Sequence, residues 1–317
     1  MEFILNLLFL VAGFYFLVKG ADLFVDGSSS IAKLMKIPAV IIGLTIVSIG
    51  TSLPEAAVSI SASLKGSYDL SIANVIGSNM FNLLMVVGVS AIICPFFVDH
   101  MIMKRDFPIC IGLTILFAFM LRDNALSRLE SVLLFILFIS YIILLVISAL
   151  KSRSTDAEEI KVLSPAKSVF FIILGAAGII AGGQLTVNSA TFFAAALGMS
   201  ELLIGLTVVA VGTSLPELVT SIVAAKKGES EIALGNVVGS NIFNILFILG
   251  MSGIVHPLSC DRGAFFDSII LIGICLIMYA ACKTSNKATR SEGIVCVFIY
   301  IIYVLYAILR AYGMLPF

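Results

Sequence analysis

The chain has 317 residues and no net charge at neutral pH, and it is 60% hydrophobic but only 12% charged. Its mean hydropathy of +1.16 lies far above that of soluble domains, in which about a quarter of the residues are charged. Composition therefore excludes a soluble globular domain, and the balanced charge argues against nucleic acid as a partner. The six cysteines show no CxxC spacing, which predicts neither disulfides nor a metal site.

Ten apolar segments follow one another along the chain, each close to the length that crosses a hydrocarbon core. Their approximate spans are 3–25, 38–64, 70–93, 106–121, 129–150, 167–193, 201–225, 231–255, 264–282 and 293–315. Continuous apolar runs of this length predict helices and not strands. No basic stretch precedes the first segment, so we expect it to stay in the protein and not to serve as a cleavable signal.

The polar stretch Lys151–Lys167 separates two halves of five segments each. The halves repeat: IGLTIVSIGTSLPE and NVIGSNMFN recur as IGLTVVAVGTSLPE and NVVGSNIFN, at a gapless offset of 162 residues from Ile42 to Pro95. We therefore predict an N-terminal repeat at 1–150, a linker at 151–166 and a C-terminal repeat at 167–317. Because five is odd, the second half must enter the membrane from the opposite side, as in secondary transporters. The predicted fold is an all-α polytopic membrane protein with ten transmembrane helices in two inverted five-helix repeats.

The basic residues divide unequally between the two sides that this topology predicts. One side carries Lys33, Lys36, Lys104, Arg105, Lys151, Arg153, Lys161, Lys167, Lys226, Lys227, Lys283, Lys287 and Arg290, and the other carries Lys65, Arg122, Arg128, Arg262 and Arg310. By the positive-inside rule the richer side is cytoplasmic. This places the N-terminus outside and the central linker in the cytoplasm.

Each half carries the sequence GTSLPE, which puts a glutamate, Glu55 or Glu217, inside an apolar segment. A carboxylate at mid-membrane costs about 2.5 kcal/mol or more on insertion scales, so we expect it to face a cavity and to have a partner. These two segments contain no lysine or arginine, which leaves a proton, a mobile cation or both. In an inverted repeat both glutamates can lie at one depth, where a single divalent cation would neutralise their two charges.

The residues around each glutamate offer oxygen ligands. A threonine and a serine precede the glutamate by four and three residues, on or beside the same helix face. The proline before the glutamate cannot donate a backbone hydrogen bond, so a carbonyl one turn earlier loses its helical partner. The next segment adds a stripe of amides and hydroxyls spaced by four. An all-oxygen set suits hard cations such as calcium or sodium and disfavours soft metals.

The candidate ligands from this pattern are Glu55, Glu217, Thr51, Ser52, Thr213, Ser214, Ser78, Asn82, Ser240 and Asn244. Asn74 and Asn236 begin the same stripes, but hydrogen bonding between helices explains them equally well. Asp22 and Asp26, near the end of the first segment, are weaker candidates for the lining of a path to the site, and a position at the membrane interface is the simpler explanation.

With GTSLPE and a following GSN-x-FN in both halves, the chain resembles the cation/calcium antiporter superfamily, and within it the prokaryotic sodium/calcium exchangers. The resemblance covers nearly the whole chain. It implies a central ion site made by the second, third, seventh and eighth helices, in which Glu55 and Glu217 bind both calcium and sodium. It also implies that the carbonyls of Ser48 and Ala210 ligate sodium. Some relatives have aspartate where this chain has Asn244, and asparagine here argues against potassium co-transport.

The implied function is a secondary antiporter that exchanges sodium for calcium by alternating access at one shared site, with no cofactor and no catalytic residue. A proton/calcium antiporter would use the same carboxylates, although the threonine–serine sets favour sodium because protons do not need neutral oxygens. A passive cation channel fits inverted repeats less well. An intramembrane enzyme is disfavoured because both histidines lie in predicted loops, away from any serine nucleophile. We expect a monomer in the lipid bilayer of a prokaryotic plasma membrane, with the first and sixth helices sliding past a fixed core.

Overall fold

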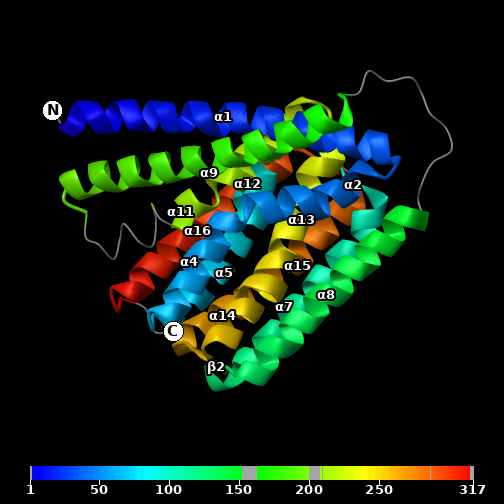
Figure 1. Ribbon diagram of the computed structural model, residues 1–317. Helices are drawn as coiled ribbons and strands as arrows, with labels where there is room; N and C mark the ends of the chain where they lie inside the picture. The colour runs from blue at the N-terminus through cyan, green and yellow to red at the C-terminus, as the bar shows by residue number, and fades with distance from the viewer. Residues whose placement is uncertain (1, 152–162, 200–207, 209, 286, 315–317) are drawn as a thin grey trace.

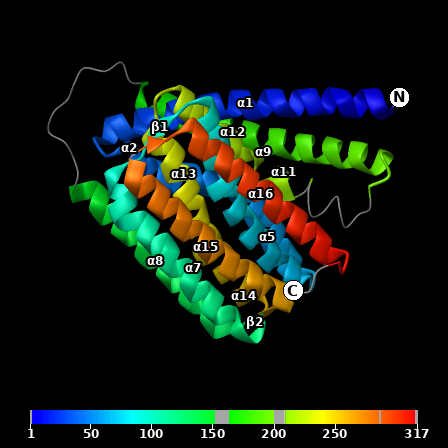
Figure 2. The ribbon, with the colours of Figure 1, turned by 180° about the vertical axis from the view of Figure 1, so that it is seen from behind.

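The computed structural model describes residues 2–151, 163–199, 208, 210–285 and 287–314, and within these ranges the regular secondary structure is helical apart from four two-residue strands. Two long helices, α1 (Glu2–Met35) and α9 (Pro165–Ala196), lie side by side along one edge of the molecule (Figure 1). The other long helices run together in a different direction beneath this pair (Figures 1 and 2). The structure therefore divides into a two-helix layer and a larger helical body.

The first half of that body contains three helices that are interrupted or preceded by π-helical or irregular turns, and one uninterrupted helix. Its elements are α2 (Ala39–Ile42), η1 (Gly43–Val47), α3 (Ser48–Thr51), α4 (Leu53–Leu64), α5 (Tyr68–Phe81), η2 (Asn82–Val86), α6 (Val87–Ile93), β1 (Phe96–Phe97), η3 (Ile102–Asp106), α7 (Phe107–Met120), η4 (Leu121–Asp123), β2 (Ala125–Leu126) and α8 (Arg128–Lys151).

The second half repeats this order. Its described elements are α11 (Ala210–Thr213), α12 (Leu215–Lys226), α13 (Ser230–Phe243), η6 (Asn244–Leu249), α14 (Gly250–Val255), β3 (Leu258–Ser259), α15 (Arg262–Ser285), β4 (Lys287–Ala288) and α16 (Arg290–Ala311). The offset of 162 holds for helix starts as well as for the motifs: α5 and α13 begin at Tyr68 and Ser230, and α8 and α16 at Arg128 and Arg290. The structural correspondence thus extends well beyond the stretch in which the sequences are visibly similar.

Two short antiparallel ribbons join the halves at opposite ends of the body (Figure 2). In one, Phe96 pairs with Ala288, and in the other Leu126 pairs with Leu258. Residues 96 and 258 differ by 162, as do 126 and 288, so each ribbon is the repeat-related copy of the other. Both ribbons connect one half to the other, and neither lies within a single half.

Seven helices are long and apolar enough to cross a membrane, and α2–α4 add an eighth span that is bent by 49°. The protein is therefore an integral membrane protein. The predicted segment 106–121 forms the shorter helix α7, and the predicted segment 201–225 lies partly outside the described residues. The count of ten transmembrane helices thus remains a prediction.

The predicted end of the first segment at residue 25 is wrong, because α1 continues for ten more residues to Met35. Polar residues in this extension find partners on other elements. The hydroxyl of Ser30 lies 3.0 Å from that of Ser168 on α9, and Lys33 pairs with Glu229 beyond α12. Smaller shifts of up to four residues occur elsewhere; α9 begins at 165, and α16 begins at 290 and ends at 311.

The helices α1 and α9 pack against each other antiparallel through glycines spaced by seven residues. A Cβ added at Gly182 on α9 would lie 2.5 Å from the backbone nitrogen of Leu17 and 2.6 Å from the carbonyl oxygen of Gly13. Gly20 and Gly175 approach each other's helix equally closely. Backbone thus packs on backbone, as small residues permit between membrane helices.

Candidate ion-binding site

The two GTSLPE motifs form helix breaks, as the prolines predict. In the first half α3 ends at Thr51, Ser52 leaves the helical region with φ −87° and ψ 8°, and α4 begins at Leu53. Ser214 repeats this break between α11 and α12 with φ −93° and ψ 6°. Because Pro54 and Pro216 carry no N–H, the helical hydrogen-bond ladder cannot cross either break. Each break therefore opens polar backbone inside the helical body.

The two glutamates are buried, with 1% of Glu55 and 1% of Glu217 exposed, and each is held by the other half of the chain. The hydroxyl of Ser52 donates to Oε1 of Glu217 at 2.7 Å, and the hydroxyl of Ser214 donates to Oε1 of Glu55 at 2.9 Å. The two carboxylates are close enough for their charges to interact. The motifs are thus brought together as one site, with each serine fixing the opposite glutamate.

The hydroxyl residues of the two motifs and of the following helices extend this network. The hydroxyl of Ser78 on α5 lies 3.1 Å from that of Ser214, and Ser240 on α13 donates to the carbonyl of Ser48 at 3.5 Å. The Thr51 hydroxyl lies 3.0 Å from the amide oxygen of Asn236. Thr213, the repeat partner of Thr51, is buried at the end of α11.

Asn82 and Asn244 each stand at the first position of a π-helical segment, η2 and η6. Their amide nitrogens donate across the repeat interface, Asn82 to Oδ1 of Asn241 at 3.1 Å and Asn244 to Oδ1 of Asn79 at 3.0 Å. Since the nitrogens are used in this way, the two amide oxygens remain available as ligands. π-Helical turns often occur at functional sites. The regular four-residue spacing of the polar stripe did not predict η2 or η6.

Four buried oxygens distinguish this site from the rest of the described structure. Oε2 of Glu55 and Glu217 and Oδ1 of Asn82 and Asn244 accept no hydrogen bond, and no other buried carboxylate or amide oxygen in the described ranges shares this condition. A buried acceptor without a partner is costly, and these four come as two repeat-related pairs. Carboxylate and amide oxygens are the ligand types that hard cations such as calcium or sodium prefer.

Asn74 and Asn236 are placed where they brace the helices. The amide of Asn74 donates to the hydroxyl of Ser59 at 2.9 Å and to the backbone carbonyl of Glu55 at 3.3 Å. Asn236 makes the matching bonds to Ser221 at 3.0 Å and to the carbonyl of Glu217 at 3.4 Å. These contacts join α5 to α4 and α13 to α12, which is the helix–helix role that sequence left open for them.

Asn79 and Asn241 were not among the predicted site residues, although they lie at the centre of the repeat interface. The amide of each donates to the backbone carbonyl of the other at 3.3 Å, and each side-chain oxygen receives the amide of Asn244 or Asn82. The GSN motif that recurs in both halves was the sequence signal that could have identified them. They hold the amides of Asn82 and Asn244 and, through these bonds, orient the two amide oxygens that have no partner.

The two carbonyls suggested by family resemblance are placed differently by the structure. The Ser48 carbonyl accepts from the backbone N–H of Ser52 at 3.1 Å and from the Thr51 hydroxyl at 3.3 Å, so it lies next to the helix break. Ala210 is the first residue of α11 and adjoins residue 209, outside the described residues. A sodium-binding role for either carbonyl stays a prediction.

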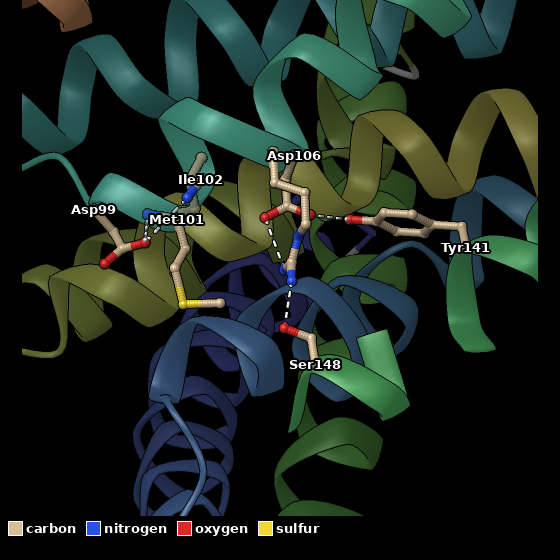
Figure 3. Close-up of polar contacts among 7 residues, drawn as sticks. Asp99, Met101, Ile102, Asp106, Tyr141 and Ser148 are labelled. Atoms are coloured by element: carbon tan, nitrogen blue, oxygen red, sulfur yellow. Dashed lines mark hydrogen bonds and ion pairs between the residues drawn. The ribbon is translucent and has the colours of Figure 1, made fainter. Parts of the chain in front are cut away.

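Another buried carboxylate, Asp106, lies apart from the site and is fully paired (Figure 3). Arg105 binds both of its oxygens at 3.0 Å, and the Tyr141 hydroxyl donates to it at 3.1 Å. Arg105 also donates to Ser148, while Asp99 accepts from the backbone of Met101 and Ile102 at the helix start (Figure 3). Because its oxygens are satisfied, Asp106, the last residue of η3, ties the start of α7 to α8 and is no candidate ion ligand.

The second half contains an ion pair at the positions equivalent to the Arg105–Ser148 contact. Arg310 on α16 binds both oxygens of Asp267 on α15, at 2.9 and 2.6 Å. Residues 267 and 310 are the repeat equivalents of Arg105 and Ser148, so the basic residue has moved from one helix of the pair to the other. Both halves thus fasten their last two helices at the same place by different charges.

Comparisons with a family model, with related proteins and with solved structures all point to one family. The family model described as sodium/calcium exchanger protein matches residues 5–147 and again 167–309, two stretches offset by 162. The putative antiporter CaxA of Alkalimonas amylolytica is 38% identical over 307 residues, which cover 93% of this chain and 96% of that protein. The sodium/calcium exchanger MaX1 of Methanosarcina acetivorans is 36% identical over 338 residues, 93% of this chain and 96% of that protein.

Among solved structures, the sodium-calcium exchanger NCX_Mj, soaked with zero sodium and calcium, superposes with a TM-score of 0.84 at 35% identity, over 96% of this chain and 99% of that one. The family is one of ion exchangers and not of enzymes, with the ions as substrates and not as cofactors. By the twofold family match and by relatives that span its length, this chain belongs to the sodium/calcium exchanger family.

Proposed function

We propose that this protein exchanges sodium for calcium across a membrane, at one site that both ions share. The observation that carries the proposal is the set of four unpartnered buried oxygens on Glu55, Glu217, Asn82 and Asn244. The names of the relatives agree with it.

Charge balance explains why the site takes one kind of ion at a time. Glu55 and Glu217 supply two negative charges when ionised, which one calcium ion neutralises. Sodium ions bring one charge each and would use the same carboxylates, so full occupancy by one ion excludes the other. An empty site with two exposed carboxylates resists closure in a low-dielectric interior, whereas a filled site does not. This difference couples the two fluxes and prevents a leak.

The architecture supports alternating access in an inverted-repeat transporter. We infer ten membrane-crossing helices, with 1–150 and 167–317 as the two repeats and 151–166 as a cytoplasmic linker. Helix bounds, ribbons and site contacts that recur at an offset of 162 support this inference. We further infer a monomer in a plasma membrane with the N-terminus outside, because the basic residues favour the linker side.

Sodium is favoured over protons as the driving ion because neutral oxygens surround the carboxylates. The hydroxyls of Thr51, Ser78 and Ser240 and the amide oxygens of Asn82 and Asn244 lie in or beside the glutamate network. A proton would need the carboxylates alone, whereas a hard metal cation needs several oxygen ligands around it.

The test is calcium-45 uptake into proteoliposomes loaded with sodium, compared with potassium-loaded vesicles and with an imposed pH jump. Glu55→Gln and Glu217→Gln keep the size of each side chain but remove its charge. Glu130→Gln, at a partly exposed helix start where Glu130 binds Ser127, is the matched control. We expect sodium-dependent uptake in the wild type and in the control, and none in either site variant.

Uptake driven by the pH jump alone would show a proton/calcium antiporter with the same site. Uptake that persists in both site variants would show that the glutamates do not carry calcium. Calcium flux down its own gradient without any counter-ion would instead establish a channel.

A further inference from the structure

The structure departs from its own repeat symmetry where α1 meets the helical body. Helix α1 packs along α12, whereas the repeat-related pair, α9 and α4, barely touches. At the end of α12, Lys227 places its Nζ 2.6 Å from a carboxylate oxygen of Asp22 and 2.6 Å from one of Asp26, both on α1. It also donates to the backbone carbonyl of Asp22 at 2.9 Å. A single lysine thus binds three oxygens of α1.

A second link lies nearby, between α1 and the turn that follows α12. Lys33 pairs with Glu229 at 3.1 Å, and the hydroxyl of Ser29 donates to the same carboxylate oxygen. The C-terminal turns of α1 are therefore joined to residues 227–229 by two sets of ion pairs. In one, carboxylates of α1 bind Lys227, and in the other a lysine of α1 binds Glu229. We name this set of five charged residues the α1 latch: Asp22, Asp26, Lys33, Lys227 and Glu229.

The repeat-related position at the other end of the molecule cannot form such a latch. Lys227 has the counterpart Lys65, but Asp22 and Asp26 are replaced by Gln184 and Asn188. The amide of Gln184 instead donates to Asn188 at 2.8 Å. Glu229 and Lys33 correspond to Ser67 and Ala195, so the second ion pair is missing there as well.

We propose that the α1 latch holds the transporter closed on the latch side of the ion site, and that the missing counterpart leaves the opposite side easier to open. This inference rests on the proposed exchange function. In an inverted repeat, the alternate state is the one in which the two halves exchange conformations. The latch contacts exist in one of these states only, so they lower the free energy of that state alone.

The chemistry of the latch suits a gate that must open repeatedly. Between 26% and 46% of the side chains of Lys227, Asp22 and Asp26 is exposed, so solvent screens their attraction. Burial lowers the pKa of Lys227, but hydrogen bonds and charge from Asp22 and Asp26 outweigh burial and raise it above the ordinary value. Lys227 therefore stays charged in any physiological medium. Exposed ion pairs of this kind shift an equilibrium about two- to fivefold, which biases a cycle without stopping it.

The experiment compares calcium affinity at the two faces of the membrane. Inside-out and right-side-out vesicles from cells that express the full chain are assayed for calcium-45 uptake at a range of calcium concentrations. By the positive-inside rule, the latch lies at the cytoplasmic face. Apparent affinity at a face scales with the fraction of protein open to that face. For Lys227→Gln we therefore expect half-saturation about two- to fivefold lower at the cytoplasmic face and higher at the external face.

Three further variants separate a latch from a general disturbance. Lys65→Gln removes the repeat-related lysine and should leave both affinities unchanged. The charge exchange Lys227→Glu with Asp22→Lys should restore part of the wild-type asymmetry. Gln184→Glu with Asn188→Asp installs carboxylates that Lys65 can bind when the opposite side closes, and it should shift both affinities in the same direction as Lys227→Gln does.

Equal affinities in wild type and Lys227→Gln, in vesicles that do transport calcium, would overturn the latch. So would equal shifts in Lys227→Gln and Lys65→Gln. If the wild type moves no calcium, the proposed function fails. Hydrogen exchange over Asp22–Met35 then decides on the latch, which requires faster exchange in Lys227→Gln than in Lys65→Gln.

Discussion

The close packing of α1 against α9 leaves no room for an added methyl group at Gly182. The Cβ of Gly182→Ala would lie 2.5 Å from the nitrogen of Leu17 and 2.6 Å from the oxygen of Gly13. Both are backbone atoms of a regular helix and cannot rotate away. Since ordinary contacts lie at about 3.5–4 Å, the two helices must separate by about 1 Å. Overpacking of this kind costs about 1–3 kcal/mol.

The matched control is Gly112→Ala on α7, where an added Cβ meets nothing within 4 Å. There the substitution should stabilise the helix by about 0.5–1 kcal/mol, because alanine loses less backbone entropy than glycine. We expect opposite shifts in the melting temperature of the detergent-solubilised protein, read by size-exclusion chromatography after heating. Equal melting of the two variants would refute the close backbone packing, whatever the effect on transport.

Further predictions concern the site, an ion pair and a thiol. Ser52→Ala and Ser214→Ala should each weaken calcium uptake by about tenfold and to a similar extent, because each removes one charge-assisted hydrogen bond to a buried glutamate of the proposed site; markedly unequal losses would contradict the symmetric arrangement. Arg310→Ala leaves its aspartate partner on α15 buried and unpaired and should cost about 3 kcal/mol, measured by thermal unfolding against the exposed Arg290→Ala. Burial, with nearby carboxylates, raises the pKa of the Cys260 thiol to about 12, so its maleimide labelling should be slow at pH 7 and rise about tenfold per pH unit; a rate independent of pH would contradict this.

The sequence was sufficient for the features that repeat and for those that proline dictates. Two glutamates in apolar segments, each after a proline, predict a helix break with a carboxylate beside it, and the structure has a break in each motif, at Ser52 and Ser214. The polar stripe of α5 also follows from its four-residue spacing. These predictions succeed because they depend on residues close together in the chain.

Pairings between distant residues could not be predicted in this way. Nothing in the local sequence shows that Ser52 binds Glu217 and not the nearby Glu55, because that choice depends on how the halves pack. The extension of α1 past residue 25 depends in the same way on Glu229, some two hundred residues away. Alignment of the two halves places Arg105 at the position equivalent to Asp267. Only the packing of the helices shows that Arg105 pairs with Asp106 and that Asp267 pairs with Arg310.

The contacts between the halves carry a consequence for the origin of the chain. Ser52 binds Glu217 as Ser214 binds Glu55, and Asn79 and Asn241 bind each other through identical groups. The ribbons exchange strands in the same reciprocal manner. A reciprocal interface of this type is what two identical subunits form about a two-fold axis. An ancestral gene for one half alone would have encoded a subunit able to assemble the whole ion site with an oppositely inserted copy of itself, and fusion then left each half free to acquire its own charges.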